Sequence, residues 1–169
     1  MRGKQAPKRK IAPDHKFNSV LIARFINQIM RRGKKSIAEQ IVYTAFDFIK
    51  EKTKKDPLLV FEQAMKNVAP AVEVRSRRIG GANYQIPVEV RGNRKETLAF
   101  RWIIGAAKAQ RGKPMHQRLG LELIAASQKQ GDAIKKREDV HRMAEANRAF
   151  AHFAWSELRS AGRAFAHFA

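Results

Sequence analysis

Three arginines, Arg75, Arg77 and Arg78, precede the pair Gly80-Gly81 and are the side chains best suited to binding chemistry in this sequence. A guanidinium group presents a planar fork of N–H donors that matches the oxygens of a phosphate. The chain has 169 residues, with 35 Lys and Arg against 15 Asp and Glu, and a formal net charge of +20. A charge of this sign and size favours a nucleic acid as the partner, ahead of an anionic membrane surface.

The cations gather in three runs along the chain. Residues 1–16 hold six Lys or Arg against one acid, and the five residues at 31–35 include four cations. Residues 75–118 hold eleven Lys or Arg and two acids. One such run is ordinarily a solvated charged face, but three runs in one chain favour the binding of a polyanion.

The sequence lacks the motifs of the common enzyme classes. It contains no cysteine, which excludes disulfides, cysteine-ligated zinc and thiol catalysis. No phosphate-binding loop, dinucleotide fingerprint, H-E-x-x-H or G-x-S-x-G motif occurs. His141 and His152 are eleven residues apart, too far for one helix to bring to a common metal ion. We therefore predict a protein that is not an enzyme and uses neither a metal nor a cofactor.

The apolar segments of the chain are short. No apolar run approaches the roughly 18 residues that a membrane-spanning helix requires. The basic N-terminus is not followed by the apolar segment of a secretory signal. These features predict a cytoplasmic protein with no membrane partner and no small-molecule substrate.

The elements that must position the cations are mostly helices, because apolar residues recur at helical spacing through most of the chain. The predicted helices span residues 17–31, 36–52, 57–69, 94–110, 115–130 and 132–155. Ser36 and Glu39 match a capping box, and Asp56 precedes Pro57 as a capping acid. The predicted fold class is mainly α, a bundle of six helices with a protruding two-stranded β-hairpin.

For three of the helices, the spacing of residues predicts which side chains share one face of the helix. In helix 36–52 the predicted buried stripe is Ile37, Ile41, Ala45, Phe48 and Ile49. In helix 94–110 a predicted cationic stripe, with a spacing of seven residues, is Arg94, Arg101 and Lys108. In helix 132–155 the predicted polar face is Arg137, His141, Arg148 and His152. Trp102 and Trp155 are predicted to pack in the core rather than to stack on bases.

Residues 71–90 alternate apolar and polar side chains on both sides of Gly80-Gly81, which is the pattern of a β-hairpin. The apolar residues at even positions are predicted to share one face: Val72, Val74, Tyr84, Ile86, Val88 and Val90. Arg75 and Arg77 are predicted to lie on the opposite face. An isolated hairpin is marginal in water, so this one needs a helical body and leaves an arginine-rich tip projecting.

Three segments divide the chain in the prediction: a basic arm at 1–16, a helical nucleic-acid-binding domain at 17–156 with its hairpin at 71–90, and a C-terminal tail at 157–169. The arm combines clustered charge with prolines and is predicted to be disordered until it meets a partner. The tail, predicted to be flexible, ends in a duplication, because residues 148–154 recur letter for letter at 163–169. We assign no function to the second copy.

Three motifs carry a resemblance to a known family. They are FINQIMRRGKKSIAE at 25–39, PAVEVRSRRIGGANYQIPVEV at 70–90 and KKREDVHRMAEANRAFAH at 135–152. Over about residues 10–156 the chain resembles the small-subunit ribosomal protein seven family, a universal ribosomal protein, in its bacterial form. The resemblance implies a bundle of six helices with a protruding β-ribbon, in agreement with the apolar pattern.

The resemblance also implies a function, that of a structural constituent of the small ribosomal subunit in the cytoplasm. Members of this family are primary rRNA-binding proteins that bind the 3′ major domain of 16S rRNA and nucleate assembly of the 30S head. The implied position lies near the exit-site tRNA and the mRNA exit. The implied protein partners are the small-subunit ribosomal proteins nine and eleven.

Carried over onto matching positions, the resemblance implies two sets of contact residues. The implied rRNA-binding residues are Lys8, Arg9, Lys10, Arg32, Gly33, Lys34, Lys35, Arg75, Arg77, Arg78, Arg94, Arg101, Arg111, Lys113 and Met115. The implied tRNA-binding residues are Gly80, Gly81, Ala82, Asn83, Tyr84, Arg142, Arg148 and His152.

Three other functions fit the same sequence. A free basic RNA-binding translational repressor would use the same cations. A nucleic-acid architectural protein would share the basic ribbon but usually carries an apolar wedge at its tip, where this chain has Gly80-Gly81-Ala82-Asn83. An RNA-processing enzyme with scattered carboxylates is the third, and it would lose activity when single carboxylates are changed.

Overall fold

The computed structural model describes residues 9–154, which form helices and one two-stranded sheet. The helices are α1 (Val20–Ile29), α2 (Lys35–Thr53), α3 (Pro57–Val68), α4 (Asn93–Ala109), α5 (Met115–Ser127), α6 (Asp132–Ala146) and the 3-10 helix η1 (Arg148–Ala154). The antiparallel strands, together called the ribbon below, are β1 (Val72–Ile79) and β2 (Ala82–Glu89). The predicted fold class is confirmed.

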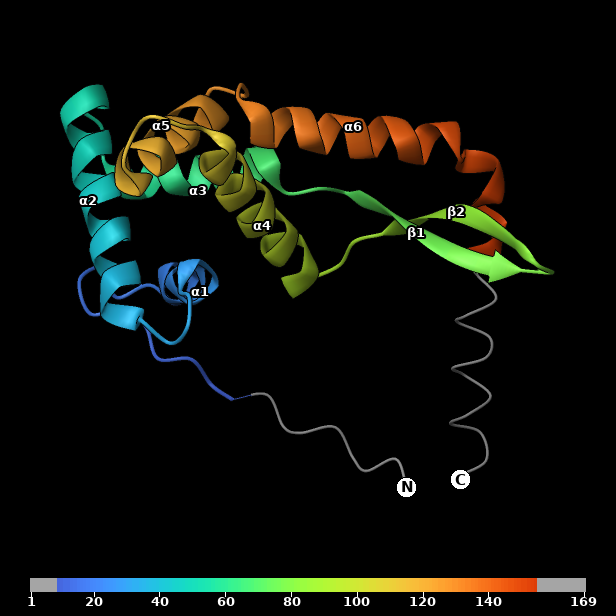
Figure 1. Cartoon of the computed structure of the whole chain (residues 1–169), viewed down its shortest axis with the longest axis horizontal. Helices are drawn as coiled ribbons and strands as arrows, with labels where there is room; N and C mark the ends of the chain where they lie inside the picture. Colours follow the sequence, from blue (N-terminus) through green and yellow to red (C-terminus); the bar gives the residue numbers. More distant parts are fainter. Residues whose placement is uncertain (1–8, 155–169) are drawn as a thin grey trace.

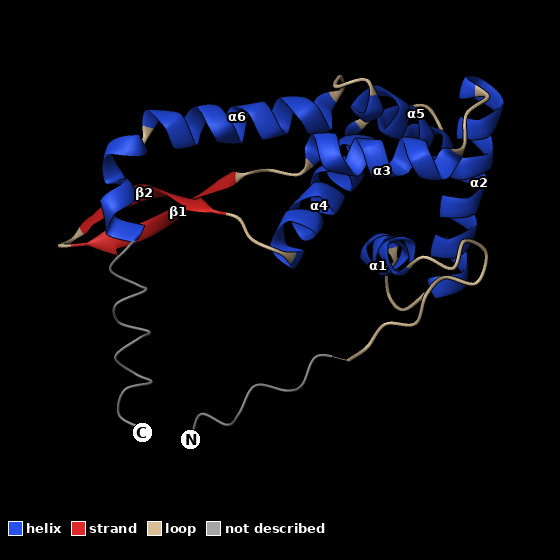
Figure 2. Ribbon diagram, turned by 180° about the vertical axis from the view of Figure 1, so that it is seen from behind, coloured by secondary structure: helices blue, strands red, loops and turns tan. Residues whose placement is uncertain are grey.

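The molecule is elongated, with a helical body of α1–α5 at one end and the ribbon at the other (Figure 1). α6 runs from the body alongside the ribbon, and η1 packs against β2 (Figure 2). The ribbon therefore protrudes from the body together with α6 rather than alone. One of its faces is covered by α6 and η1.

The core of the body is built on three fully enclosed phenylalanines, Phe25, Phe46 and Phe61. The ring of Phe25 in α1 lies 5.1 Å from that of Phe61 in α3 and 5.3 Å from that of Phe100 in α4, between centroids. The ring of Phe46 in α2 lies 5.6 Å from that of Phe61. Burial of each such side chain contributes roughly 1.5–3 kcal/mol, so four helices form one rigid support.

α2 begins one residue earlier than predicted and without the predicted cap. Arg32 (φ 51°) and Gly33 (φ 73°) turn the chain so that Lys34 becomes the N-cap residue, and its side chain makes no capping hydrogen bond. Ser36 therefore lies inside the first turn of the helix. The capping-box prediction is wrong because the positive-φ turn places the helix start before the serine.

The buried face of α2 is also rotated relative to the prediction. Its buried residues are Ala38, Val42, Ala45, Phe46 and Ile49. Ala45 and Ile49 are buried as predicted, whereas Ile37 is 50% exposed. The reason is the aromatic core, because the ring of Phe46 packs on that of Phe61 in α3, whereas α5 approaches α2 at Ala45 and Phe48. The buried face is therefore turned toward Val42 and Phe46.

Two further predictions about helices are confirmed within the described residues. Asp56 caps α3, because its Oδ1 accepts a hydrogen bond from the Leu58 N–H at 3.0 Å. Trp102 is partly buried and packs against the core. Trp155 lies outside the described residues.

The predicted helix at 132–155 is in fact two elements. α6 ends at Ala146, and η1 begins at Arg148. Between them, the Asn147 side-chain amide donates a hydrogen bond to the Met143 carbonyl oxygen at 2.8 Å. A side-chain amide that binds the backbone of the preceding turn competes with helix propagation, which accounts for the early end of α6.

The register of the ribbon depends on its two-residue turn. Gly80 (φ 57°) and Gly81 (φ 94°) form this turn, in a conformation that glycine adopts without strain. A two-residue turn pairs positions of opposite parity, so that Arg77 lies opposite Tyr84 and Arg75 lies opposite Ile86. Directly opposed residues of an antiparallel pair share a face.

The predicted apolar face of the ribbon is therefore wrong for the first strand. Because of the opposite parity, one face carries Glu73, Arg75, Arg77, Tyr84, Ile86 and Val88. Val72 and Val74 lie on the other face, with Arg78. Arg75 and Arg77 share the face that turns toward α6 and η1, instead of opposing the apolar residues of β2.

Candidate nucleic-acid interface

Two of the predicted rRNA-binding arginines meet at one buried carboxylate, Glu73 of β1, which is 7% exposed. Its Oε1 accepts from Arg75 Nε at 2.6 Å, and its Oε2 accepts from Arg94 Nε at 3.1 Å and Nη2 at 3.0 Å. Arg75 belongs to the ribbon and Arg94 to α4. The carboxylate thus joins the ribbon to the helical body.

Glu73 stays ionised in this arrangement. Burial by itself raises the pKa of its carboxyl, but the hydrogen bonds and charges of Arg75 and Arg94 outweigh burial and hold the pKa below its usual range. Sequence reasoning missed this residue. The available signal was its position two residues before Arg75, since alternate residues of a strand share a face.

The other two arginines of the ribbon separate from each other. The Arg77 Nη1 group donates a hydrogen bond to the Phe153 carbonyl oxygen of η1 at 3.2 Å, so Arg77 fastens the ribbon to the end of the described chain. Arg78 is exposed on the opposite face of β1. The three neighbouring arginines therefore have three different surroundings.

The cationic loop between α1 and α2 is exposed at Arg31, Arg32, Gly33 and Lys34. Beside it lies a hollow of about 320 Å³, called the loop groove, whose lining includes Met30, Arg31, Lys34, Lys108, Met115 and Arg118. The fold thus brings the predicted loop and Met115 next to the predicted stripe on α4. Sequence reasoning did not foresee that these segments share one groove.

The remaining predicted cations of this region lie on the surface. Arg101 is exposed on α4, and Arg111 and Lys113 are exposed in the connection between α4 and α5. Lys35 is exposed at the start of α2, where its Nζ lies 3.6 Å from Glu39 Oε1. A surface pair of this kind contributes little stability, so Lys35 stays available to a phosphate.

The described part of the basic arm borders a second hollow, of about 850 Å³, called the arm groove. Its polar lining comes from the arm, α1 and α4: Arg9, Lys10, Arg24, Asn27, Gln28, Asn93, Glu96 and Thr97. Arg24 Nη1 lies 2.7 Å from Glu96 Oε2, which ties α1 to α4. Sequence reasoning missed the polar face of α1, and Lys8 lies outside the described residues.

Asp14 fixes the end of the arm to the body. Its carboxylate is buried and accepts from the Lys16 and Phe17 N–H groups at 3.2 Å and from the Tyr43 hydroxyl at 2.7 Å. Burial and this hydrogen bond raise the pKa of Tyr43 to about 12. Ordered contacts therefore begin inside the segment that was predicted as a disordered arm.

The ribbon tip and η1 bring most of the predicted tRNA-binding residues together. Gly80, Gly81, Ala82 and Asn83 are exposed at the tip, whereas the adjacent Tyr84 is half-buried. The centroids of the Phe150 and Phe153 rings lie 5.2 and 5.5 Å from that of Tyr84. The ring of His152 lies 4.0 Å from that of Phe153. The tip is thus backed by a cluster of aromatic rings.

The predicted polar face of the last helix is divided between two surroundings. Arg148 and His152 of this face are exposed, as is Arg142, which was predicted separately as a tRNA-binding residue. Arg137 instead donates a hydrogen bond to the Asn67 carbonyl oxygen, and His141 Nε2 accepts one from the Ala71 N–H at 3.2 Å. Burial and the nearby Arg137 lower the pKa of His141. These two side chains hold α6 to the body.

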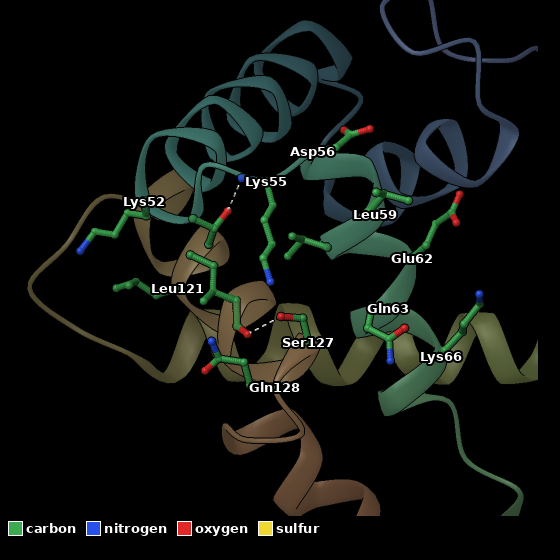
Figure 3. A pocket seen from close by; sticks show the side chains of 13 residues that line it. Lys52, Lys55, Asp56, Leu59, Glu62, Gln63, Lys66, Leu121, Ser127 and Gln128 are labelled. Carbon is green, nitrogen blue, oxygen red and sulfur yellow. Dashed lines mark hydrogen bonds between the residues drawn. The ribbon is translucent and has the colours of Figure 1, made fainter.

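A third hollow, of about 830 Å³, lies between α2, α3 and α5 (Figure 3). Its rim alternates cations with acids, such as Lys55, Asp56, Glu62 and Lys66, over apolar residues that include Leu121. Alternating charge does not select a polyanion.

Nowhere in residues 9–154 do three His, Asp or Glu side chains gather in a way that would hold a metal ion. No helix within that range is long and apolar enough to cross a membrane.

The fold and the exposed cations are those of a basic, mainly helical protein of the nucleic-acid-binding class, with a protruding β-ribbon. The particular family follows from comparison with known proteins. The family model described as "Ribosomal protein S7p/S5e" matches residues 1–148. The chain belongs to this family and is a structural ribosomal protein rather than an enzyme, as predicted.

Similar proteins named "Small ribosomal subunit protein uS7" occur in several bacteria. The one from Thermotoga maritima is 59% identical over 155 residues, which cover 92% of this chain and 100% of the relative. Those from Bradyrhizobium sp. and Afipia carboxidovorans are 57% and 59% identical over 150 residues, which cover 89% of this chain and 96% of each relative. The predicted location on the cytoplasmic small ribosomal subunit agrees with these names.

Proposed function

We propose that this chain is a primary rRNA-binding protein of the small ribosomal subunit, which binds the 3′ major domain of 16S rRNA and nucleates assembly of the head. The names of the relatives support the subunit, and the resemblance of the three motifs supports the RNA domain. The observation that carries the proposal is the loop groove, where Arg31, Lys34 and Lys108 converge from segments distant in the sequence.

The mechanism is the holding of RNA and includes no bond-making step. Each Lys or Arg that meets a phosphate releases condensed counterions, so affinity falls steeply as salt rises. Selectivity comes from shape, because folded RNA presents its phosphates and 2′-hydroxyls in a fixed arrangement. The aromatic core keeps the cations of α1, α2 and α4 at fixed separations, which suits them to one arrangement of phosphates.

The ribbon tip and η1 are the part proposed to lie near the exit-site tRNA and the mRNA exit. The exposed Gly80, Gly81 and Asn83 allow close approach of backbone to backbone, and Arg148 adds a cation. Tyr84 contributes by holding the tip against Phe150. The small-subunit ribosomal proteins nine and eleven are the proposed protein partners.

The test is a salt titration of binding to the 3′ major domain of 16S rRNA, with a scrambled RNA of equal length as the control. A preference of about a thousandfold at physiological salt is expected, since specific nucleic-acid complexes exceed non-specific ones by at least this factor. Equal affinities that vanish together as salt rises would contradict the proposal and leave only a generic polycation.

A further inference from the structure

We propose that Glu73 is a positioning residue, which holds Arg75 and Arg94 as one preorganised pair of phosphate-binding guanidiniums. The proposal rests on the proposed rRNA binding and goes beyond it. It assigns a role in binding a polyanion to an acidic residue. The ligand is a phosphodiester of the RNA backbone that meets the ribbon and α4 together.

The two oxygens of Glu73 are divided between the two arginines. Oε1 lies 2.6 Å from both Nε and Nη2 of Arg75. Oε2 accepts hydrogen bonds from the same two nitrogens, Nε and Nη2, of Arg94. Each guanidinium is thus gripped along one edge, which fixes both its position and the plane of its fork. Arg75 and Arg94 belong to separate elements, β1 and α4, so Glu73 is the group that joins them.

Donors are left over on both arginines. A guanidinium has five N–H groups, and Glu73 occupies only the Nε and Nη2 edge of each. Within residues 9–154, the Nη1 groups of Arg75 and Arg94 make no hydrogen bond. The side chains are 56% and 45% exposed, whereas Glu73 is shielded beneath them. A phosphate can therefore reach the free donors without displacing the carboxylate.

The charges of the triad favour an anion. Two guanidiniums and one carboxylate leave a net charge of +1 on the surface. A buried carboxylate without partners would be costly, so the pairing is firmly maintained. Arginines that are already held lose less conformational freedom when they bind a phosphate than free ones do.

Positioning and simple charge make opposite predictions for Glu73→Gln. If only net charge matters, removing an acid beside two arginines strengthens RNA binding. If Glu73 positions the arginines, its removal releases both and weakens binding. The sign of the change therefore tests the proposal.

The experiment measures the affinity of the Glu73→Gln chain for the 3′ major domain of 16S rRNA at several salt concentrations. We expect a loss on the order of tenfold, the scale of a lost charge-assisted hydrogen bond, with a shallower salt dependence. Glu89→Gln is the matched control, because Glu89 lies on the same ribbon, is 62% exposed and pairs with Arg91 at 2.7 Å. That variant should bind as tightly as the unaltered chain or more tightly.

A second comparison separates positioning from a contribution to folding. In a chain carrying Arg75→Ala and Arg94→Ala, adding Glu73→Gln removes a lone carboxylate, so affinity should stay level or rise. Circular dichroism and thermal melting show that each variant is folded at the temperature of the binding assay. A folding role alone would lower the melting temperature of Glu73→Gln and leave the affinity below that temperature unchanged.

The proposal is overturned if Glu73→Gln binds the RNA as well as or better than the unaltered chain. It is also overturned if Glu73→Gln weakens binding equally when both arginines are absent. Failure of the proposed function has a different signature, in which the unaltered chain binds the scrambled RNA as well as the 3′ major domain.

Discussion

The rings of Tyr84 and Phe150 lie 5.2 Å apart between centroids, and this contact fastens the outer half of the ribbon to η1. Together with the hydrogen bond from Arg77 to the Phe153 carbonyl, it gives the tip a fixed direction. Within the described residues, the ribbon and the end of α6 therefore form one unit rather than a free arm and a free helix end.

Replacing Tyr84 with Ala should loosen this unit. Loss of the two aromatic contacts is expected to lower stability by about 1–3 kcal/mol, since each ring pair contributes about 0.5–1.5 kcal/mol. Thermal melting measures the loss. Asn83→Ala, one residue away on the exposed face, is the control, and its melting temperature should equal that of the unaltered chain. Equal melting of both variants would show that the aromatic cluster does not hold the tip.

Arg77 and Arg78 are neighbours in sequence but should respond differently to substitution. Arg78→Ala is expected to weaken rRNA binding and to change stability by less than about 0.5 kcal/mol, as surface substitutions usually do. Arg77→Ala should lower stability by about 1 kcal/mol or more, because it removes a hydrogen bond from a charged donor. Urea unfolding and the RNA-binding assay, applied to both variants, measure the difference. If Arg78→Ala lost more stability than Arg77→Ala, the hydrogen bond between Arg77 and the Phe153 carbonyl of η1 would not hold the ribbon.

Gly131 is expected to resist substitution because of the carboxylate beneath it. Buried Glu122 accepts a hydrogen bond from the Ala133 N–H at 2.9 Å, and a Cβ on Gly131 would lie 2.8 Å from Glu122 Oε1. Gly131→Ala combines this clash with left-handed backbone (φ +96°). The expected loss is about 2–4 kcal/mol, from about 1 kcal/mol or more of backbone strain and 1–3 kcal/mol of overpacking.

Gly112→Ala is the matched control for Gly131→Ala. Gly112 has a similar φ of +80°, but a Cβ there would meet nothing within 4 Å. This variant should lose only the strain, about 1 kcal/mol or more. Thermal or urea unfolding of both proteins gives the comparison. Equal losses of unfolding free energy in the two variants would show that the Glu122 side chain moves aside without an energetic penalty.

The titration of Tyr43 reports the anchoring of the arm. Its pKa in the folded chain is raised from 10.0 to about 12, first by burial and then by the hydrogen bond to Asp14. A raised pKa means that Tyr43 contributes stability below pH 10, and that this contribution is lost as pH rises from 10 through 12. The chain has two tyrosines, so Tyr84→Phe leaves Tyr43 as the only phenol.

The absorbance of this phenol should therefore change with a midpoint about two units above that of a free tyrosine, while circular dichroism reports that the fold persists. Asp14→Asn in the same background should bring the midpoint down, because the carboxylate that opposes ionisation is gone. A midpoint near 10 in the folded protein would show that Asp14 and Tyr43 are not in contact in solution.

The helices and the hairpin were predictable because their causes are local. Apolar spacing marked the helical segments, Asp56 before Pro57 marked the start of α3, and Gly80-Gly81 marked the turn. The parity of the ribbon was not seen, because it depends on the number of residues in the turn rather than on alternation within each strand. The early end of α6 depends on one side-chain hydrogen bond from Asn147.

The candidate site was predictable as charge but not as arrangement. Exposed cations such as Arg32, Lys34 and Arg78 follow from composition and spacing. The roles of Glu73 and Asp14 do not follow in this way, because the spacing of Glu73 and Arg75 indicates only a shared strand face and nothing near Asp14 in the sequence indicates its contacts. Their importance comes from partners distant in the chain, Arg94 and Tyr43, which only the folded structure brings near.

The two-residue turn at Gly80-Gly81 also limits how the ribbon can change in length. Each residue inserted into or deleted from one strand would exchange the two faces beyond that point, so that Tyr84 and Ile86 would face water and Asn83 and Gln85 would face η1. Length differences in this ribbon are therefore expected in steps of two residues in each strand, because only such steps keep both the pairing and the faces. The turn makes the ribbon a module that can lengthen but cannot shift.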